Sequence, residues 1–250
     1  MKMRRKSLVT ILGIVTLLML LVGCQAIEDT TEAEGEATDA TTENDEAEVH
    51  ITDALAFKLE HEELNGVPHP DNSELLFKEM YIPEDNPFRY AEFDEIIDLL
   101  EDGTGIVYFG FPTCPWCRNL VPVLTNAAID FGVDEILYRN VLYDRNILEL
   151  EDGEVVEVRA GHPGYYQVLD ILGDFAPEYR ELEDASIRRI FVPAVVFVQD
   201  GEMISYYESL PSFQDRVSGE ELGGWLSMNE DEIEELTQIF MSYFEELFGE

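Results

Sequence analysis

The chain has 250 residues, three cysteines and a formal net charge of −39 at pH 7. This acidic balance excludes nucleic acid as a partner, because contacts with phosphates require clustered lysine and arginine side chains. It also argues against a polybasic attachment to anionic lipids. Net charge bears on solubility rather than on fold, so we interpret the acidity as a solubilising feature.

Residues 1–23 have the layout of a secretory signal peptide. Basic side chains are followed by an apolar run, and Gly23 stands directly before Cys24. This ending resembles the lipobox of bacterial lipoproteins, in which cleavage precedes a cysteine whose thiol carries diacylglycerol. The resemblance implies a lipid anchor on Cys24 at the extracytoplasmic face of a bacterial cell membrane. The alternative is an uncleaved transmembrane anchor, for which a run of about 15 apolar residues is short.

Residues 24–70 are expected to form an acidic tether. Between residues 25 and 49 the sequence is mostly Glu, Asp, Thr and Ala, with almost no large apolar side chains. Such a segment buries too little apolar surface to offset its ordering entropy and is expected to be disordered. Residues 50–70 are transitional in composition and predict no definite element.

Residues 71–250 alternate between strand and helix patterns and predict one α/β domain. The continuous apolar run at 106–111 is typical of a buried central strand. Asn229 is a candidate helix cap, and the sequence Asp200-Gly201 predicts a tight hairpin turn. We expect strands at 75–82, 106–111, 136–143, 192–198 and 203–207, and helices at 88–100, 115–131 and 230–248.

The connection over about residues 145–189 is long for a plain loop. We interpret it as an insertion that contains a small hairpin and a helix. The hairpin is expected to turn at Asp152-Gly153, and the helix to span 164–182. The insertion lies just before the predicted strand at 192–198.

Cys114-Pro115-Trp116-Cys117 is the motif that carries chemistry, because it stands where a strand meets a helix. Two cysteines separated by two residues at a helix start can close a small disulfide ring. The first sulfur lies near the unpaired N–H groups of the first turn, which favour a thiolate. The second cysteine can then resolve a mixed disulfide.

The sequence from about residue 75 onward resembles the thioredoxin superfamily. Besides the two-cysteine motif, Pro122 falls where thioredoxins carry a kinking proline in the active-site helix. Val192-Pro193 matches the family's cis-proline loop, which contacts substrates. The resemblance implies a central mixed β-sheet flanked by helices, with a helical insertion before the cis-proline strand. The stretch 111–117 further resembles the thioredoxin-like bacteriocin-transport accessory proteins.

This resemblance implies a thiol–disulfide oxidoreductase that acts on exported proteins and uses no cofactor. Thioredoxins place a buried acid six residues before the first cysteine, where this chain has Tyr108, and their partner lysine aligns with Asn140. Deprotonation of Cys117 could use water or Tyr108, although we interpret Tyr108 as a core aromatic. Arg118 could help to stabilise a thiolate or be a solvated helix residue. Val192 before the cis-proline resembles oxidising DsbA-like proteins, whereas the insertion is smaller than their helical domain. We favour a reductase or isomerase on this second feature, with an oxidant as the alternative.

Three other functions compete with thiol–disulfide exchange. A zinc site would need two ligands besides the cysteines, and none of the four histidines is paired at ligand spacing. A peroxidase of the usual two-cysteine kind lacks a third available cysteine if Cys24 is lipidated. A thioredoxin-fold accessory module for a secretion or transport partner, with non-essential cysteines, remains the main alternative.

Overall fold

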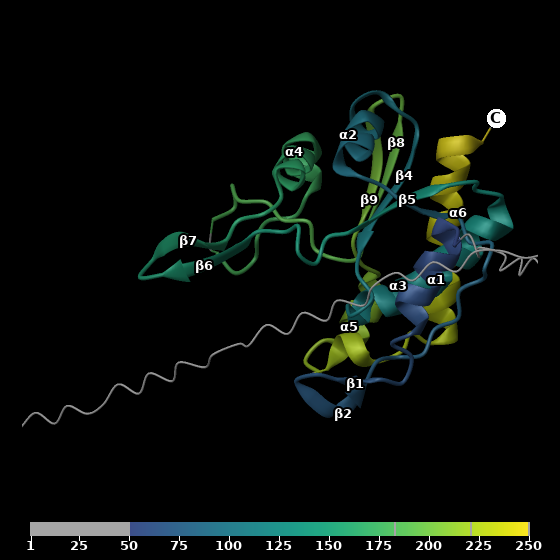
Figure 1. Ribbon diagram of the computed structural model, residues 1–250, viewed down its shortest axis with the longest axis horizontal. Coiled ribbons are helices and arrows are strands. Elements are labelled where there is room, and N and C mark those ends of the chain that lie inside the picture. Colours follow the sequence, from purple (N-terminus) through teal and green to yellow (C-terminus); the bar gives the residue numbers. More distant parts are fainter. Residues whose placement is uncertain (1–50, 183, 221, 250) are drawn as a thin grey trace, which may run out of the picture. The chain divides into compact units, whose positions relative to one another are not determined.

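A five-stranded mixed sheet organises the fold (Figure 1), with the spatial order β3–β5–β4–β8–β9. The computed structural model describes residues 51–182, 184–220 and 222–249. Strands β3, β5 and β4 are parallel, whereas β8 is antiparallel to β4 and β9 is antiparallel to β8. The strands span Phe88–Tyr90 (β3), Gly105–Gly110 (β4), Ile136–Asn140 (β5), Ala194–Gln199 (β8) and Glu202–Tyr207 (β9).

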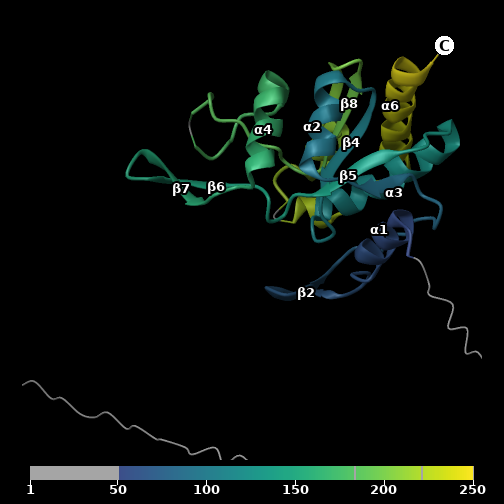
Figure 2. The ribbon, with the colours of Figure 1, turned by 45° about the horizontal axis from the view of Figure 1, so that its top comes forward.

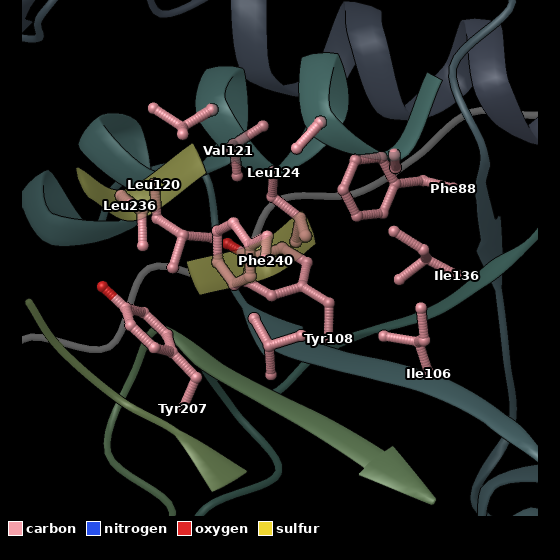
Figure 3. Close-up of a cluster of buried hydrophobic side chains, with 14 of the residues drawn as sticks. Phe88, Ile106, Tyr108, Leu120, Val121, Leu124, Ile136, Tyr207, Leu236 and Phe240 are labelled. Carbon is pink, nitrogen blue, oxygen red and sulfur yellow. The ribbon is translucent and has the colours of Figure 1, made fainter. Parts of the chain in front are cut away.

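Helices cover both faces of this sheet. The central strand β4 shows this directly, because its side chains alternate between two apolar cores. Ile106 and Tyr108 pack with α1, α3 and α6, as Figure 3 shows for Tyr108 beside Leu120 of α3. Val107 and Phe109 pack with α2 and α4 on the other face. The helices span Asp53–Glu62 (α1), Phe93–Asp102 (α2), Pro115–Phe131 (α3), Pro163–Leu172 (α4) and Glu230–Phe248 (α6).

Local signals set the ends of the two long helices. Helix α3 begins at the N-cap Cys114 and ends at Gly132, whose φ of 92° favours glycine. Helix α6 begins with a capping box, in which the side chains of Asn229 and Glu232 bond to each other's backbone N–H groups. The sequence predictions of helices at 115–131 and 230–248 are therefore confirmed.

Two Asp-Gly pairs form the tight turns that the sequence predicts. Asp200 and Gly201 have φ values of 50° and 76° between β8 and β9, and Asp152 and Gly153 have 51° and 84°. Positive φ at both central residues is typical of two-residue hairpins with a type I′ turn. The second turn joins β6 (Ile147–Glu151) to β7 (Glu154–Arg159), a hairpin that projects from the sheet in Figures 1 and 2.

The predicted strand at 75–82 and the start of the helix predicted at 88–100 are wrong. The first of these segments holds only the end of β2 (Asn72–Leu76), which pairs with the two-residue strand β1 (Pro68–His69) outside the main sheet. The edge strand β3 occupies Phe88–Tyr90, and α2 starts only at Phe93. A capping box between Glu92 and Glu95 fixes this start.

Several other boundaries also differ from the sequence predictions. Residues 53–69, assigned to the tether, contain α1 and β1, and Phe57 is fully buried in the core. The insertion helix α4 stops at Leu172, because Gly173 has a φ of 50° and begins a 3-10 turn (η1, Gly173–Phe175). The insertion over 145–189 thus contains the predicted hairpin and a shorter helix.

Two short elements between β9 and α6 were not expected. They are α5 (Pro211–Val217) and the 3-10 turn η2 (Gly223–Trp225). Within the part of the chain that the structure describes, every helix is too short or too polar to cross a membrane. The predicted signal peptide, Cys24 and the tether up to residue 50 lie outside the described residues.

Candidate active site

The two cysteines of the motif lie at the start of α3, shortly after the end of β4. Cys114 is the N-cap of α3, and its Sγ accepts a hydrogen bond from the backbone N–H of Cys117 at 3.1 Å. Pro115 occupies the first turn, where its missing N–H costs no hydrogen bond. Both cysteines are present as thiols. A helix N-terminus therefore faces the first sulfur, as the motif predicts.

Both thiols are shielded from solvent, but to different degrees. Cys114 retains 4% of its surface exposed, whereas Cys117 retains none. The pair packs in a small apolar cluster with Phe111, Trp116 and Val192. Because only Cys114 reaches the surface, it is the sulfur that an incoming disulfide can meet first.

The segment before β8 supplies the opposite wall of the site. The Cys114 thiol donates to the backbone carbonyl oxygen of Val192 at 3.7 Å. The Val192–Pro193 peptide bond is cis, in agreement with the sequence expectation. Residues 78 positions apart in the chain thus meet at one sulfur.

The two thiols share their ionisation. Burial raises the pKa of Cys114 well above its ordinary value. Burial also acts to raise the pKa of Cys117. This effect is outweighed by hydrogen bonding to the Cys114 thiol and the Tyr108 hydroxyl and, more distantly, by the Arg145 charge, so the pKa of Cys117 is lowered. Since the sulfurs interact directly, the first proton lost belongs to the pair rather than to one residue.

Tyr108 lies in the apolar core and also borders the redox pair. Its side chain is fully buried, and its hydroxyl group has no hydrogen-bond partner. A Cβ atom at Gly110 would clash with this hydroxyl, so the glycine leaves room for it at the end of β4. Burial and then the Cys117 charge raise the pKa of Tyr108, which keeps the O–H available as a donor to sulfur.

Tyr108 in turn connects to an acid at the edge of the sheet. Its ring stacks on Tyr138 of β5 with centroids 5.4 Å apart. Beyond Tyr138, Glu60 of α1 accepts hydrogen bonds from the Tyr90 hydroxyl at 2.6 Å and from the Asn140 side chain at 2.8 Å. Asn140, where thioredoxins place a lysine, therefore contacts an acid from an element that the sequence predictions missed.

Arg118 is not a solvated helix residue, which was one of the two interpretations that the sequence left open. It is fully buried one position after Cys117, and burial lowers the pKa of its guanidinium to about 10. Its nitrogens donate to the backbone carbonyls of His61, Lys78 and Pro112 at 2.9, 2.7 and 3.1 Å. Arg118 thereby ties the start of α3 to the segment that follows α1.

An open pocket adjoins the redox pair on the side of Trp116. Its volume is about 210 Å³, and Val192 and Pro193 form one wall while α5 forms another. The Trp116 ring packs edge-on against Phe213 of α5 at 5.3 Å. Gly224 of η2 lies so close that any side chain there would clash with this indole. The segment 211–225 thus fixes Trp116 and shapes the pocket.

No family model, curated protein or solved structure matches this chain. Among the residues described, no group of three or more His, Cys, Asp or Glu side chains is placed to hold a metal ion. The sequence predictions missed Arg145, α5 and η2 as parts of the site. The scarcity of basic residues in so acidic a chain is a signal that could have singled out Arg145.

Proposed function

We propose that this protein is a thiol–disulfide oxidoreductase of the thioredoxin type, with Cys114 and Cys117 as its redox pair. The observation that carries the proposal is the pair of free thiols at the start of α3, with the Cys114 Sγ atom 3.1 Å from the Cys117 backbone nitrogen and 3.7 Å from the Val192 carbonyl oxygen. A sulfur so placed has a partner thiol, a helix N-terminus and an adjacent backbone segment for a client chain.

The architecture supports the same proposal. The mixed sheet with helices on both faces is compatible with a thioredoxin-like fold. The motif stands at the end of the central strand β4, and the cis-proline segment leads into its antiparallel neighbour β8. These are the positions that the sequence resemblance assigns to the two halves of a thioredoxin site.

The exchange proceeds in two balanced steps in the reducing direction. The Cys114 thiolate attacks one sulfur of a client disulfide, which forms a mixed disulfide and releases the other client sulfur as a thiolate. The deprotonated Cys117 then attacks the Cys114 sulfur, which closes the Cys114–Cys117 disulfide and releases the second client thiolate. Two electrons and, after protonation, two protons pass to the client, and a dithiol donor restores the pair by the same exchange.

We propose that this reaction takes place outside the cytoplasm, with a lipid on Cys24 as the anchor. Client proteins would then be exported proteins with disulfides. The small insertion, with one hairpin and one short helix rather than a helical domain, favours the reducing or isomerising direction. The competing proposal is an accessory module in which the fold docks a transport partner and the cysteines are dispensable.

A trapping variant tests the exchange. In Cys117→Ala, the mixed disulfide with Cys114 cannot be resolved, so covalent complexes with exported proteins are expected to accumulate. These complexes would appear on non-reducing gels and disappear after reduction. The double variant Cys114→Ser Cys117→Ala is the matched control and should trap nothing.

Two outcomes would count against the proposal. If Cys117→Ala traps no client in cells, exchange loses its support. If the double variant also preserves the wild-type phenotype, the accessory module is the better account.

A further inference from the structure

Basic side chains are scarce in this chain, which has 15 lysines and arginines against 54 acids. Most of those described are bound to a carboxylate, as Arg180 is to Glu208 and Arg188 is to Asp174. Arg145 and Arg189, both in the insertion, form no ion pair with any residue that the structure describes. Arg118 and Arg159 also lack a carboxylate, but their guanidinium groups donate to backbone carbonyl oxygens, whereas the described residues give Arg145 and Arg189 no such acceptor.

Arg145 lies directly behind the redox pair. Its guanidinium packs over the Phe111 ring at 5.1 Å, and Phe111 in turn packs against Cys114 and Cys117. The Arg145 Nε atom is buried without a hydrogen-bond partner. The side chain therefore offers a donor next to the thiols that the described part of the protein does not use.

Arg189 approaches the same place from the segment before the cis-proline bond. Its guanidinium packs over Tyr179 at 4.3 Å and over Phe191 at 5.8 Å. Its Nη1 atom is also buried without a partner. Stacking on aromatic rings holds each guanidinium plane in one orientation, which is how arginine presents a fixed fork of donors to an anion.

Both guanidinium groups border the cysteine cluster, since Arg145 packs over Phe111 and Arg189 packs over Phe191, which precedes Val192. Burial and then the charge of Arg189 lower the pKa of Arg145. An anion between Arg145 and Arg189 would remove the repulsion and satisfy the unused donors.

We propose that Arg145 and Arg189 bind a carboxylate that a substrate carries next to its reacting disulfide. The inference rests on the proposed exchange reaction and specifies its substrate class. The carboxylate belongs either to an acidic side chain near a client cysteine or to a small disulfide-bearing acid. The rest of the protein is acidic and repels carboxylates, so Arg145 and Arg189 would attract the substrate carboxylate locally, beside Cys114.

The experiment compares substrates that differ only in this charge. Purified, reduced full-length protein is mixed with two disulfide peptides, one with Glu beside its cysteine and one with Gln. Wild type is expected to reduce the Glu peptide about tenfold faster, since a charge-assisted hydrogen bond contributes at least that factor. A second substrate pair, dithiodiglycolic acid and its diamide, shows whether a small molecule suffices.

Three variants locate the effect. Arg189→Gln should lose the preference, so that it reduces the Glu and Gln peptides at similar rates. Arg145→Gln should lose the preference and also slow both peptides, because the Arg145 charge helps to lower the pKa of Cys117. Arg188→Gln, which breaks the ion pair with Asp174 in the same loop, is the matched control and should keep the preference.

A redox-inert ligand separates failure of the site from failure of the proposed function. Peptides with Ser in place of Cys cannot exchange, and their binding is measured by calorimetry. If wild type binds the Glu form more tightly than the Gln form and Arg189→Gln binds the two equally, the site is supported even if no disulfide is reduced. The carboxylate site would be overturned if wild type bound and reduced the Glu and Gln forms equally. It would also be overturned if Arg189→Gln lost the same factor in rate with both peptides.

Discussion

At the scale of single residues, Tyr108 lies six residues before Cys114, where the proposed resemblance to thioredoxins would place a buried acid. Such an acid can accept a proton, whereas a tyrosine whose pKa is raised by burial keeps its proton and donates a hydrogen bond. Beside Cys117, such a donor favours the thiolate and so lowers the pKa of the pair. Tyr108 is thus a positioning residue that stabilises charge on the resolving cysteine.

Replacing Tyr108 by Phe tests this role with little change in packing. Loss of the hydroxyl removes one of the groups that lower the pKa of Cys117, so the pH–rate profile for thiol alkylation and for exchange should move to higher pH. Rates at high pH should equal those of wild type. Tyr138→Phe, on the neighbouring strand, is the control, and an unchanged profile in Tyr108→Phe would refute the role.

The residue scale also shows what the sequence could not reveal. The cysteine spacing and Val192-Pro193 are local patterns, and the structure brings them together as expected. The burial of Arg118 depends on carbonyls at His61 and Lys78, which are 57 and 40 positions away. No periodicity in the helix around Arg118 reports such distant partners.

At the scale of elements, the sequence predicted those whose ends are fixed by local caps and turns. It did not predict those that depend on long-range strand pairing. Helices α3 and α6 and the two Asp-Gly hairpins carry their own caps and turns. The segment 75–82 has a strand-like composition, yet β2 ends at Leu76 and pairs only with β1. Helix α1 escaped prediction because only Phe57 and His61 of its ten residues are buried, so no regular apolar face marks it.

The docking of α1 depends on keeping His61 neutral. His61 is fully buried, stacks on Phe57 at 4.1 Å, and bonds through Nδ1 to the Phe57 carbonyl oxygen at 2.9 Å. Burial, opposed by this bond and aided by the Arg118 charge, lowers its pKa from 6.5 to about 4. The unfolded chain therefore binds a proton at a pH where the folded chain does not.

This difference predicts a loss of stability in mild acid. Below about pH 6.5 the unfolded state gains a proton, so between pH 7 and pH 5 His61 alone should remove about 2 kcal/mol from the free energy of unfolding. Denaturant titrations of wild type and His61→Leu at both pH values measure it. The variant should lose about 2 kcal/mol less than wild type over that interval. Equal losses would show that His61 is not held neutral.

At the scale of the whole molecule, the proposed lipid anchor is consistent with the charge. Loss of residues 1–23 would remove four basic side chains and move the formal charge from −39 to about −43. So acidic a domain would be repelled by anionic lipids, so we propose that a hydrophobic anchor, and not charge, attaches it. Among three cysteines, assigning Cys24 to lipid leaves only the redox pair.

The mass of the protein recovered from membranes tests this assignment. We expect a chain that begins at Cys24 and carries diacylglycerol, while Cys24→Ser should lack the lipid. Intact-mass spectrometry of detergent extracts distinguishes the two. A membrane-bound wild-type chain that retains residues 1–23 and no lipid would instead support an uncleaved transmembrane anchor.

The redox potential of the Cys114–Cys117 couple tests the central claim most directly. The protein is equilibrated with thiol–disulfide buffers of graded potential, and its free thiols are counted by alkylation and mass, with Cys114→Ser Cys117→Ser as the blank. We predict one reversible two-electron transition, closer to the value of about −270 mV typical of thioredoxin than to about −120 mV for a strong oxidant. If no Cys114–Cys117 disulfide forms at any potential, the protein is not a thiol–disulfide oxidoreductase.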